Sequence, residues 1–167
     1  MTGRLFRTTI VVGGLATLIA GCATGGSGAK KMSAADTVSE RQRYMKLHGG
    51  LWRDIQDKAK VNNFDGIAVS AEALALNAPR IPAMFPEGSM TSDSKAKPEI
   101  WQKWPEFEKA SMAMKTEAEK LRDAARAKNG DQVQGVMKDF GRNACGTCHT
   151  PFRVPPPQQP APAQPSR

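Results

Sequence analysis

The sequence has few cysteines, few aromatic side chains and no dense block of one charge. Only 3 of its 167 residues are cysteine, an odd number that is too small for a disulfide framework. Phe, Trp and Tyr make up 6% of the chain and stand singly, without the clusters of Lys and Arg that accompany them in nucleic-acid binding proteins. The formal charge of +8 is spread along the chain, so no nucleic-acid partner is expected.

The sequence also lacks an apolar run long enough to span a membrane. Its most apolar stretch, Ile10–Ala20, follows two arginines and is too short to cross about 30 Å of hydrocarbon. Residues 1–21 are therefore predicted to be a signal peptide. The stretch ends in L-I-A-G-C at residues 18–22, which resembles the bacterial lipoprotein box, where the cysteine takes a diacylglycerol. The alternative is an ordinary secretory signal with an incidental cysteine.

An acylated Cys22 would be the first residue of the mature chain. Residues 22–32, which are rich in Gly, Ser and Ala, would then form a flexible tether. The domain would face the periplasm and be held to a membrane by lipid. Residues 154–167 are dominated by proline and carry one charge, so an extended, unpacked tail is expected there. One globular domain is predicted over residues 33–153.

Four segments of this domain have the period of an amphipathic helix, and none has the alternation of a strand. Each apolar stripe needs neighbours to leave water, so an all-α, antiparallel four-helix bundle is predicted. The first helix is expected to be capped by Ser33, and the second to start after Asp65 and stop before Pro79. The third is expected to start at Pro98 and stop at Asn129-Gly130, and the fourth to be capped by Asp131. The predicted inward positions are Val38, Arg41, Met45, His48, Trp52, Ile55, Ala59, Ile67, Ala71, Leu74, Ala78, Trp104, Phe107, Ser111, Met114, Ala118, Leu121, Ala125, Val133, Met137, Phe140, Ala144 and Cys148.

Residues 145–149 form a C-x-x-C-H motif. On a helix, its spacings put two thiols and one imidazole on neighbouring positions of one face. The thiols can add to the two vinyl groups of one porphyrin, and the imidazole then lies beneath the iron as its proximal ligand. A redox dithiol would need a βαβ setting, and a zinc site would need a fourth ligand that only His48 or Cys22 could supply. Cys145, Cys148 and His149 are therefore predicted to hold one covalent haem c.

The motif and three other segments resemble the class II c-type cytochromes, the cytochrome c-prime family, over residues 33–153. Those segments are Arg41-Gln42, I-P-A-M-F-P at 81–86 and P-E-I-W at 98–101. The resemblance implies a four-helix bundle with haem near the carboxyl end of the fourth helix. It also implies that four further side chains belong to the haem pocket: Arg41 and Gln42 near the propionates, Phe85 in the lining, and Arg153 near the proximal imidazole. By periodicity alone, Arg41 would be a solvated charge at the end of the inward stripe.

The resemblance places the residue four positions after Arg41 over the distal face of the iron. Five-coordinate members usually have leucine there, and their low-spin relatives have methionine. This sequence has Met45, whose soft thioether would favour ferrous iron. Met45 could instead be a core methionine, and His48, one helical turn further on, is a rival ligand.

Two functions remain open from the sequence. The first is a lipid-anchored electron carrier with His149 and Met45 as axial ligands, which would exchange electrons with redox partner proteins. The second is a five-coordinate protein that binds or buffers nitric oxide or carbon monoxide. An enzyme is not expected, because His48 is the only acid–base candidate beside the haem. Family members often pair through their first two helices, so a homodimer is a further expectation, and Gly49-Gly50 would allow close approach to a neighbouring helix or subunit.

Overall fold

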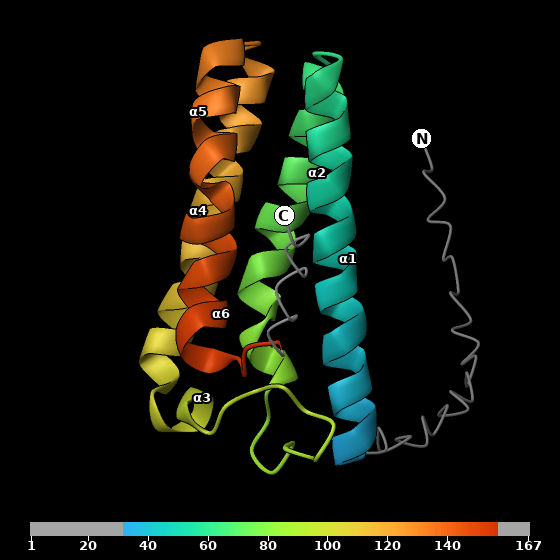
Figure 1. Ribbon diagram of the computed structural model, residues 1–167, viewed down its shortest axis with the longest axis vertical. Helices are drawn as coiled ribbons and strands as arrows, with labels where there is room; N and C mark the ends of the chain where they lie inside the picture. The colour runs from blue at the N-terminus through green and yellow to red at the C-terminus, as the bar shows by residue number, and fades with distance from the viewer. Residues whose placement is uncertain (1–31, 157–167) are drawn as a thin grey trace, which may run out of the picture. The chain divides into compact units, whose positions relative to one another are not determined.

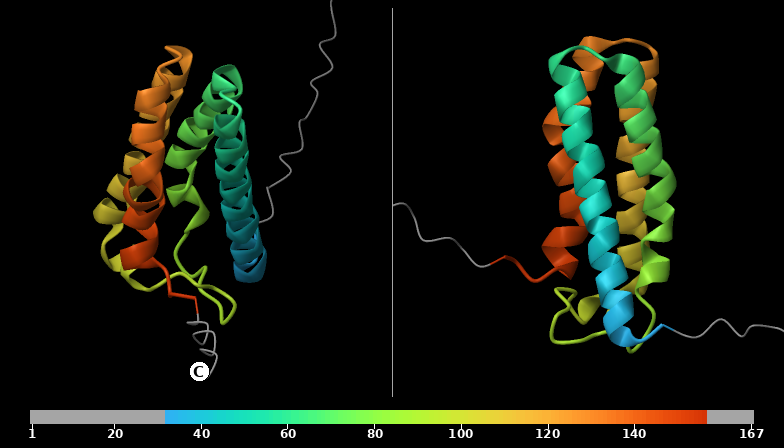
Figure 2. Two further views of the ribbon diagram at one scale, coloured as in Figure 1. Left: turned by 45° about the horizontal axis from the view of Figure 1, so that its top comes forward. Right: turned by 90° about the vertical axis from the view of Figure 1, so that its right-hand side faces the viewer.

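The computed structural model describes residues 32–156, which form four helical columns (Figure 1). The fourth column consists of three helical pieces that follow one another without a break. Successive columns run in opposite directions (Figure 2), so the predicted antiparallel four-helix bundle is confirmed. The columns are α1 (Ala34–Lys60), α2 (Phe64–Asn77), α4 (Trp104–Arg126), and α5 (Gly130–Phe140) with the π-helical η3 (Gly141–Gly146) and α6 (Thr147–Phe152).

Capping side chains set the starts of three helices. Ser33 is the N-cap of α1, as predicted, and its Oγ accepts a hydrogen bond from the Asp36 backbone N at 3.1 Å. α2 begins at Phe64 because Asn63 Oδ1 accepts from the Gly66 N at 2.9 Å. The predicted cap at Asp131 is wrong: Asn129, in an extended conformation two residues earlier, caps α5 by accepting from the Gln132 N at 3.0 Å.

The helix predicted from Pro98 to Asn129-Gly130 is interrupted and shorter than expected. A single turn, α3 (Glu99–Gln102), ends at Lys103, and α4 begins immediately after it. Pro105 explains the break, because it has no backbone N–H to donate and its ring would clash with the preceding turn. The loop before α3 contains two 3₁₀ turns, η1 (Ala78–Arg80) and η2 (Pro82–Met84).

The inward faces predicted from periodicity are buried at most positions, and side chains such as Ile55, Leu74 and Phe140 are fully enclosed. The exceptions are half-buried: Met45, Trp52, Ala59, Trp104, Met137 and Cys148. Three of these, Met45, Trp52 and Cys148, line a cavity within the bundle. Partial burial at those positions therefore marks an internal site rather than a weak core.

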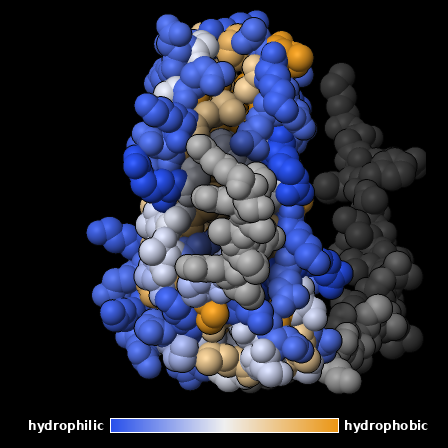
Figure 3. Space-filling view, viewed as in Figure 1, coloured by the Kyte–Doolittle hydropathy of each residue, from blue (hydrophilic) through white to orange (hydrophobic). Residues whose placement is uncertain are grey.

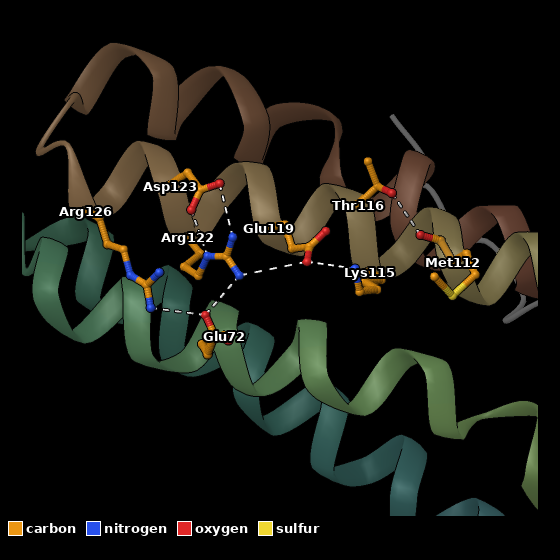
Figure 4. A network of polar contacts seen from close by, with 8 residues as sticks. All are labelled: Glu72, Met112, Lys115, Thr116, Glu119, Arg122, Asp123 and Arg126. Atoms are coloured by element: carbon orange, nitrogen blue, oxygen red, sulfur yellow. Dashed lines mark hydrogen bonds and ion pairs between the residues drawn. The ribbon is translucent and has the colours of Figure 1, made fainter.

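Ion pairs tie α2 to α4 on the side of the bundle that Figure 4 shows from close by. Glu72 of α2 accepts from Arg122 Nη1 at 3.1 Å and from Arg126 Nη2 at 3.2 Å. Asp123 accepts from the Nε of the same Arg122 at 2.8 Å. The pKa of Arg122 is raised, first by its hydrogen bonds with Asp123, and the guanidinium remains charged. These contacts fix the register of α2 on α4.

One face of the domain is mainly polar. Hydrophilic side chains cover most of the face shown in Figure 3. Within residues 32–156, no helix is both long enough and apolar enough to cross a membrane. The predicted signal peptide, Cys22 and residues 157–167 of the predicted tail lie outside the described residues.

Candidate haem-binding site

A cavity of about 660 Å³ lies between α1 and the fourth column. Among the described residues, α1 packs against α2 and the η2 turn, whereas its backbone stays apart from α5, η3 and α6. The cavity volume falls in the range of small-molecule and cofactor sites. Its apolar walls come from every column and from the loop: Val38, Trp52, Leu74, Ile81, Phe85, Ile100, Phe107, Met114, Phe140, Ala144 and Phe152.

Aromatic side chains form part of the wall of this cavity. Trp52 of α1 stacks on Phe140 of α5, with ring centroids 4.5 Å apart and planes at 11°, and so bridges the two columns at one end. Phe85 packs edge-on against Phe107 at 4.9 Å, and its carbonyl accepts a hydrogen bond from Trp101 Nε1 at 2.9 Å. The resemblance placed Phe85 in the pocket lining, and that is where its ring lies.

The two thiols and the imidazole of the C-x-x-C-H motif all line the cavity. Cys145 belongs to the π-helical η3, and Cys148 and His149 lie in the first turn of α6. π-Helical turns occur often at functional sites, and periodicity did not predict this one. Its sequence signal, weak by itself, is the pair Gly141 and Gly146 that begins and ends the segment.

The electrostatics of the motif disfavour the two rival sites. Burial raises the pKa of Cys145, and burial together with Cys145 raises the pKa of Cys148 to about 11. A redox dithiol requires the opposite shift, toward a thiolate at neutral pH. Among residues 32–156, no group of three His, Cys, Asp or Glu side chains is placed to hold a metal ion by itself. The arrangement therefore suits thiols that bond to a cofactor.

Both candidate distal ligands, Met45 and His48, face the same cavity from α1. Met45 is half-buried, whereas His48 is only 7% exposed and its Nε2 has no hydrogen-bond partner among the described residues. Burial, and then the charge of His149, lower the pKa of His48 to about 4, so its ring is neutral at neutral pH. Sequence reasoning treated Met114 of α4 as ordinary core, yet it also lines this cavity.

Arg41 is buried, contrary to the solvated charge that periodicity suggests. Its side chain is 5% exposed, Nη1 donates to Ser89 Oγ and Nη2 to the Ser89 carbonyl, both at 2.7 Å. The guanidinium also lies 4.6 Å from the centroid of the Phe85 ring. No carboxylate of the described residues forms an ion pair with it, and burial lowers its pKa. A buried cation at the cavity edge is therefore suited to an anionic group of a cofactor.

The two remaining residues implied by the resemblance lie at the mouth of the cavity. Gln42 is exposed, and its Nε2 donates to the Asp93 carbonyl at 3.4 Å. Arg153 forms an isolated antiparallel bridge with Ala96, and its charge contributes, after burial, to lowering the pKa of His149. Eight of the nine predicted site residues therefore border one cavity. The ninth, Cys22, lies outside the described residues.

The residues present fit a covalently bound haem. Cys145 and Cys148 would supply the thioethers, and His149, whose pKa is lowered by burial, would supply an iron ligand. The apolar walls suit the porphyrin faces, and the unpaired charge of Arg41 suits a propionate. His48 Nε2 is a buried polar atom that a group within the cavity could satisfy.

Comparisons with known proteins agree with this site. Residues 36–153 match the family model described as Cytochrome C'. A cytochrome c-554 of Cereibacter sphaeroides is 39% identical over 75 residues, which cover 43% of this chain and 48% of that protein. The match thus spans about half the length of the curated relatives.

Solved structures share the fold over nearly their whole length. A cytochrome c′ with an unusual ligand-controlled dimer dissociation aligns with a TM-score of 0.66 and 22% identity, covering 74% of this chain and 98% of that one. The nitric oxide complex of a variant of cytochrome c prime from Alcaligenes xylosoxidans aligns with a TM-score of 0.64 and 25% identity, with the same two coverages, 74% and 98%. Because the family model spans most of the sequence and the cavity holds both thiols and the imidazole, the chain belongs to the cytochrome c′ family, the class II c-type cytochromes, and carries covalently attached haem c.

Proposed function

We propose that this protein is a low-spin electron carrier in which His149 and Met45 are the two axial ligands of the iron. Proteins of the family transfer electrons or bind ligands at their haem, and are periplasmic. The observation that supports electron transfer here is the position of Met45, which lines the cavity from α1 while His149 lines it from α6. An iron with its sixth position filled has no open site for a gas, and its coordination changes little when an electron moves.

The side chains around the cavity suit this role. Bound haem supplies a one-electron Fe(III)/Fe(II) couple. The Met45 thioether is a soft ligand that favours the ferrous state, and the lowered pKa of His149 favours the neutral ring, which has a lone pair for the iron. Trp52 and Phe140, which stack on each other, add apolar surface to the cavity wall. Arg41 keeps a positive charge at the cavity edge, which also favours the reduced state.

The test is a set of single substitutions read by absorption spectroscopy. Met45→Leu preserves volume, so its packing cost should stay below about 1.5 kcal/mol. The variant should become high-spin, bind carbon monoxide readily, lose the weak sulfur-to-iron charge-transfer band and shift to a lower reduction potential. Met114→Leu is the matched control, because Met114 lines the same cavity from α4 and should leave the spectrum unchanged.

His48→Gln separates the two candidate ligands on α1. If that change, and not Met45→Leu, produces high-spin iron, the distal ligand is the histidine. If the wild-type protein is itself high-spin, the assignment of Met45 fails and the five-coordinate alternative, binding or buffering of nitric oxide or carbon monoxide, replaces the carrier function.

We also propose that the chain is exported and anchored through an acylated Cys22. The support is the sequence of residues 1–22 alone, because these residues lie outside the described part of the structure. Cys22→Ser should release a soluble form or stall processing, since cysteine alone accepts the diacylglycerol. Membrane fractionation and the mass of the mature amino terminus would decide. A soluble wild-type protein that starts after Cys22 contradicts the anchor.

A homodimer through the outer faces of α1 and α2 completes the proposal. Three large apolar side chains are exposed on these two helices: Leu47 at 49%, Val69 at 70% and Leu76 at 65%. Exposed apolar patches on helices often mark protein contacts. Val69→Lys with Leu76→Lys should then yield a monomer in sedimentation equilibrium at concentrations where the wild type is dimeric. A wild type that is monomeric at all concentrations refutes the pairing.

A further inference from the structure

The charges that line the haem cavity are all of one sign. Five of its lining residues are Lys or Arg, whereas none of the 16 Asp and Glu residues of the chain, all of which lie between residues 32 and 156, lines it. One of the five, Arg41, is buried. The other four are exposed and are here named the cavity rim: Lys46, Arg53, Lys95 and Arg153.

The cavity rim faces solvent from two sides of the mouth. Lys46 and Arg53 lie seven residues apart on α1. Lys95 and Arg153 lie on neighbouring segments, held together by the Val154 N donating to the Lys95 carbonyl at 2.8 Å. No rim residue forms an ion pair with a carboxylate of the described residues.

Haem itself does not cancel this charge. Its two propionates carry at most two negative charges, against five cations around the cavity. The buried Arg41 is best placed to neutralise one of them, because it has no other anionic partner. An excess of positive charge therefore remains on the exposed rim, where it attracts an anionic surface over roughly one Debye length, about 8–10 Å.

We propose that the cavity rim is the docking surface for the acidic face of a redox partner protein. This inference rests on the proposed electron-carrier function, since it names the partner surface that the haem would face. Complementary charge at such a rim steers encounter and orients the partner toward the cofactor. We favour a protein surface over anionic lipid because the rim surrounds the mouth of the haem cavity, which the partner of an electron carrier must approach, and a lipid accepts no electron.

Stopped-flow oxidation of the ferrous, haem-loaded full chain tests the proposal. Acidic plastocyanin is the protein probe: one electron leaves the ferrous iron and reduces Cu(II) to Cu(I). The cation tris(phenanthroline)cobalt(III) is the second oxidant, which takes one electron to become Co(II) and is repelled by the rim. The rim variant is Lys46→Gln with Arg53→Gln and Lys95→Gln. The control variant removes the same charge from exposed lysines outside the cavity, by Lys103→Gln with Lys109→Gln and Lys128→Gln.

At low ionic strength, the rim variant should react with plastocyanin at least about 10-fold more slowly than wild type, and added salt should slow it much less. The control variant should stay within about 2-fold of wild type, and neither variant should slow the reaction with the cobalt cation. Equal losses in both variants, or no loss in the rim variant, would overturn the inference.

A lipid role for the rim gives a different result. It predicts that the rim variant loses the wild-type preference for phosphatidylglycerol over phosphatidylcholine vesicles while its reaction with plastocyanin is unchanged, and that outcome overturns the proposal. Failure of the carrier function itself is distinguishable, because wild-type protein would then be high-spin and slow with both oxidants.

Discussion

Replacing Arg41 by methionine should destabilise the domain by detaching the loop between α2 and α3 from α1. Methionine keeps the unbranched apolar stem but removes every donor. Arg41 makes two 2.7 Å hydrogen bonds to Ser89, whose side chain and backbone are 3% exposed, and a longer one of 3.2 Å to the Met84 carbonyl. The variant therefore leaves the buried Ser89 carbonyl without a partner.

The expected cost is the balance of three terms. Hydrogen bonds from a charged donor contribute about 1.5–3 kcal/mol each, and the contact with Phe85 adds about 0.5–1 kcal/mol. Against these, the variant no longer buries a charge that pairs with no carboxylate of the described residues, which recovers several kcal/mol. The net loss should be about 2–3 kcal/mol, equivalent to a fall in Tm of roughly 6–15 °C for a domain of this size.

Urea unfolding of the holoprotein, followed by tryptophan fluorescence and circular dichroism, measures this loss. Arg43→Met is the control, because Arg43 is exposed and pairs with Glu40 at 2.9 Å on the surface, and its loss should cost less than about 0.5 kcal/mol. Arg41→Lys should fall between the two, since one ammonium cannot reproduce the fork that holds both Ser89 atoms. An Arg41→Met variant as stable as Arg43→Met would refute the view that this arginine fixes the loop.

Three further predictions follow from the same structure. The pKa of folded His48, about 4, lies below its ordinary value of 6.5, so the stability it contributes is complete above pH 6.5 and is lost as the pH falls toward 4. The free energy of unfolding, measured by urea titration, should fall by up to about 3 kcal/mol over that window. His48→Gln should largely remove this fall. Gly50→Ala should stabilise α1 by about 0.5–1 kcal/mol in thermal melts, because a Cβ there meets nothing within 4 Å, whereas Gly88→Ala should destabilise because its φ is +71°. Cys145→Ser with Cys148→Ser should abolish haem staining after denaturing electrophoresis, and retained covalent haem would contradict the attachment site.

Much of the fold follows from residue spacing alone. Inward positions such as Ile67, Leu74 and Leu121 recur at helical intervals and are fully buried. The errors occur where one side chain decides between nearby alternatives. Asn129 and Asp131 can both cap a helix, and only the backbone conformation selects Asn129. Proline at 105 could kink or break a helix, and the structure has the break.

The site was predictable in part. The C-x-x-C-H motif is local in sequence, so its three side chains were identified by spacing. Burial of Arg41 was not, because its partner Ser89 is 48 residues away and no pattern links the two. Gly49 and Gly50 were expected to allow close approach to a neighbouring helix, which is wrong within residues 32–156: a Cβ at Gly49 would meet only the Arg53 guanidinium, and one at Gly50 nothing. Contact with a second subunit stays a prediction.

The separation of α1 from the fourth column bears on how the holoprotein is assembled. The backbones of the two columns stay apart and the columns meet through side chains such as Trp52 and Phe140, whereas α1 packs closely against α2. Such a helix opens at a lower free energy than the core formed by α2 and α4. Before attachment, transient opening of α1 can therefore give the porphyrin access to the cysteines. After attachment, contacts with the cofactor hold α1 in place. Amide exchange in α1 should therefore slow more on haem attachment than exchange anywhere else in the domain.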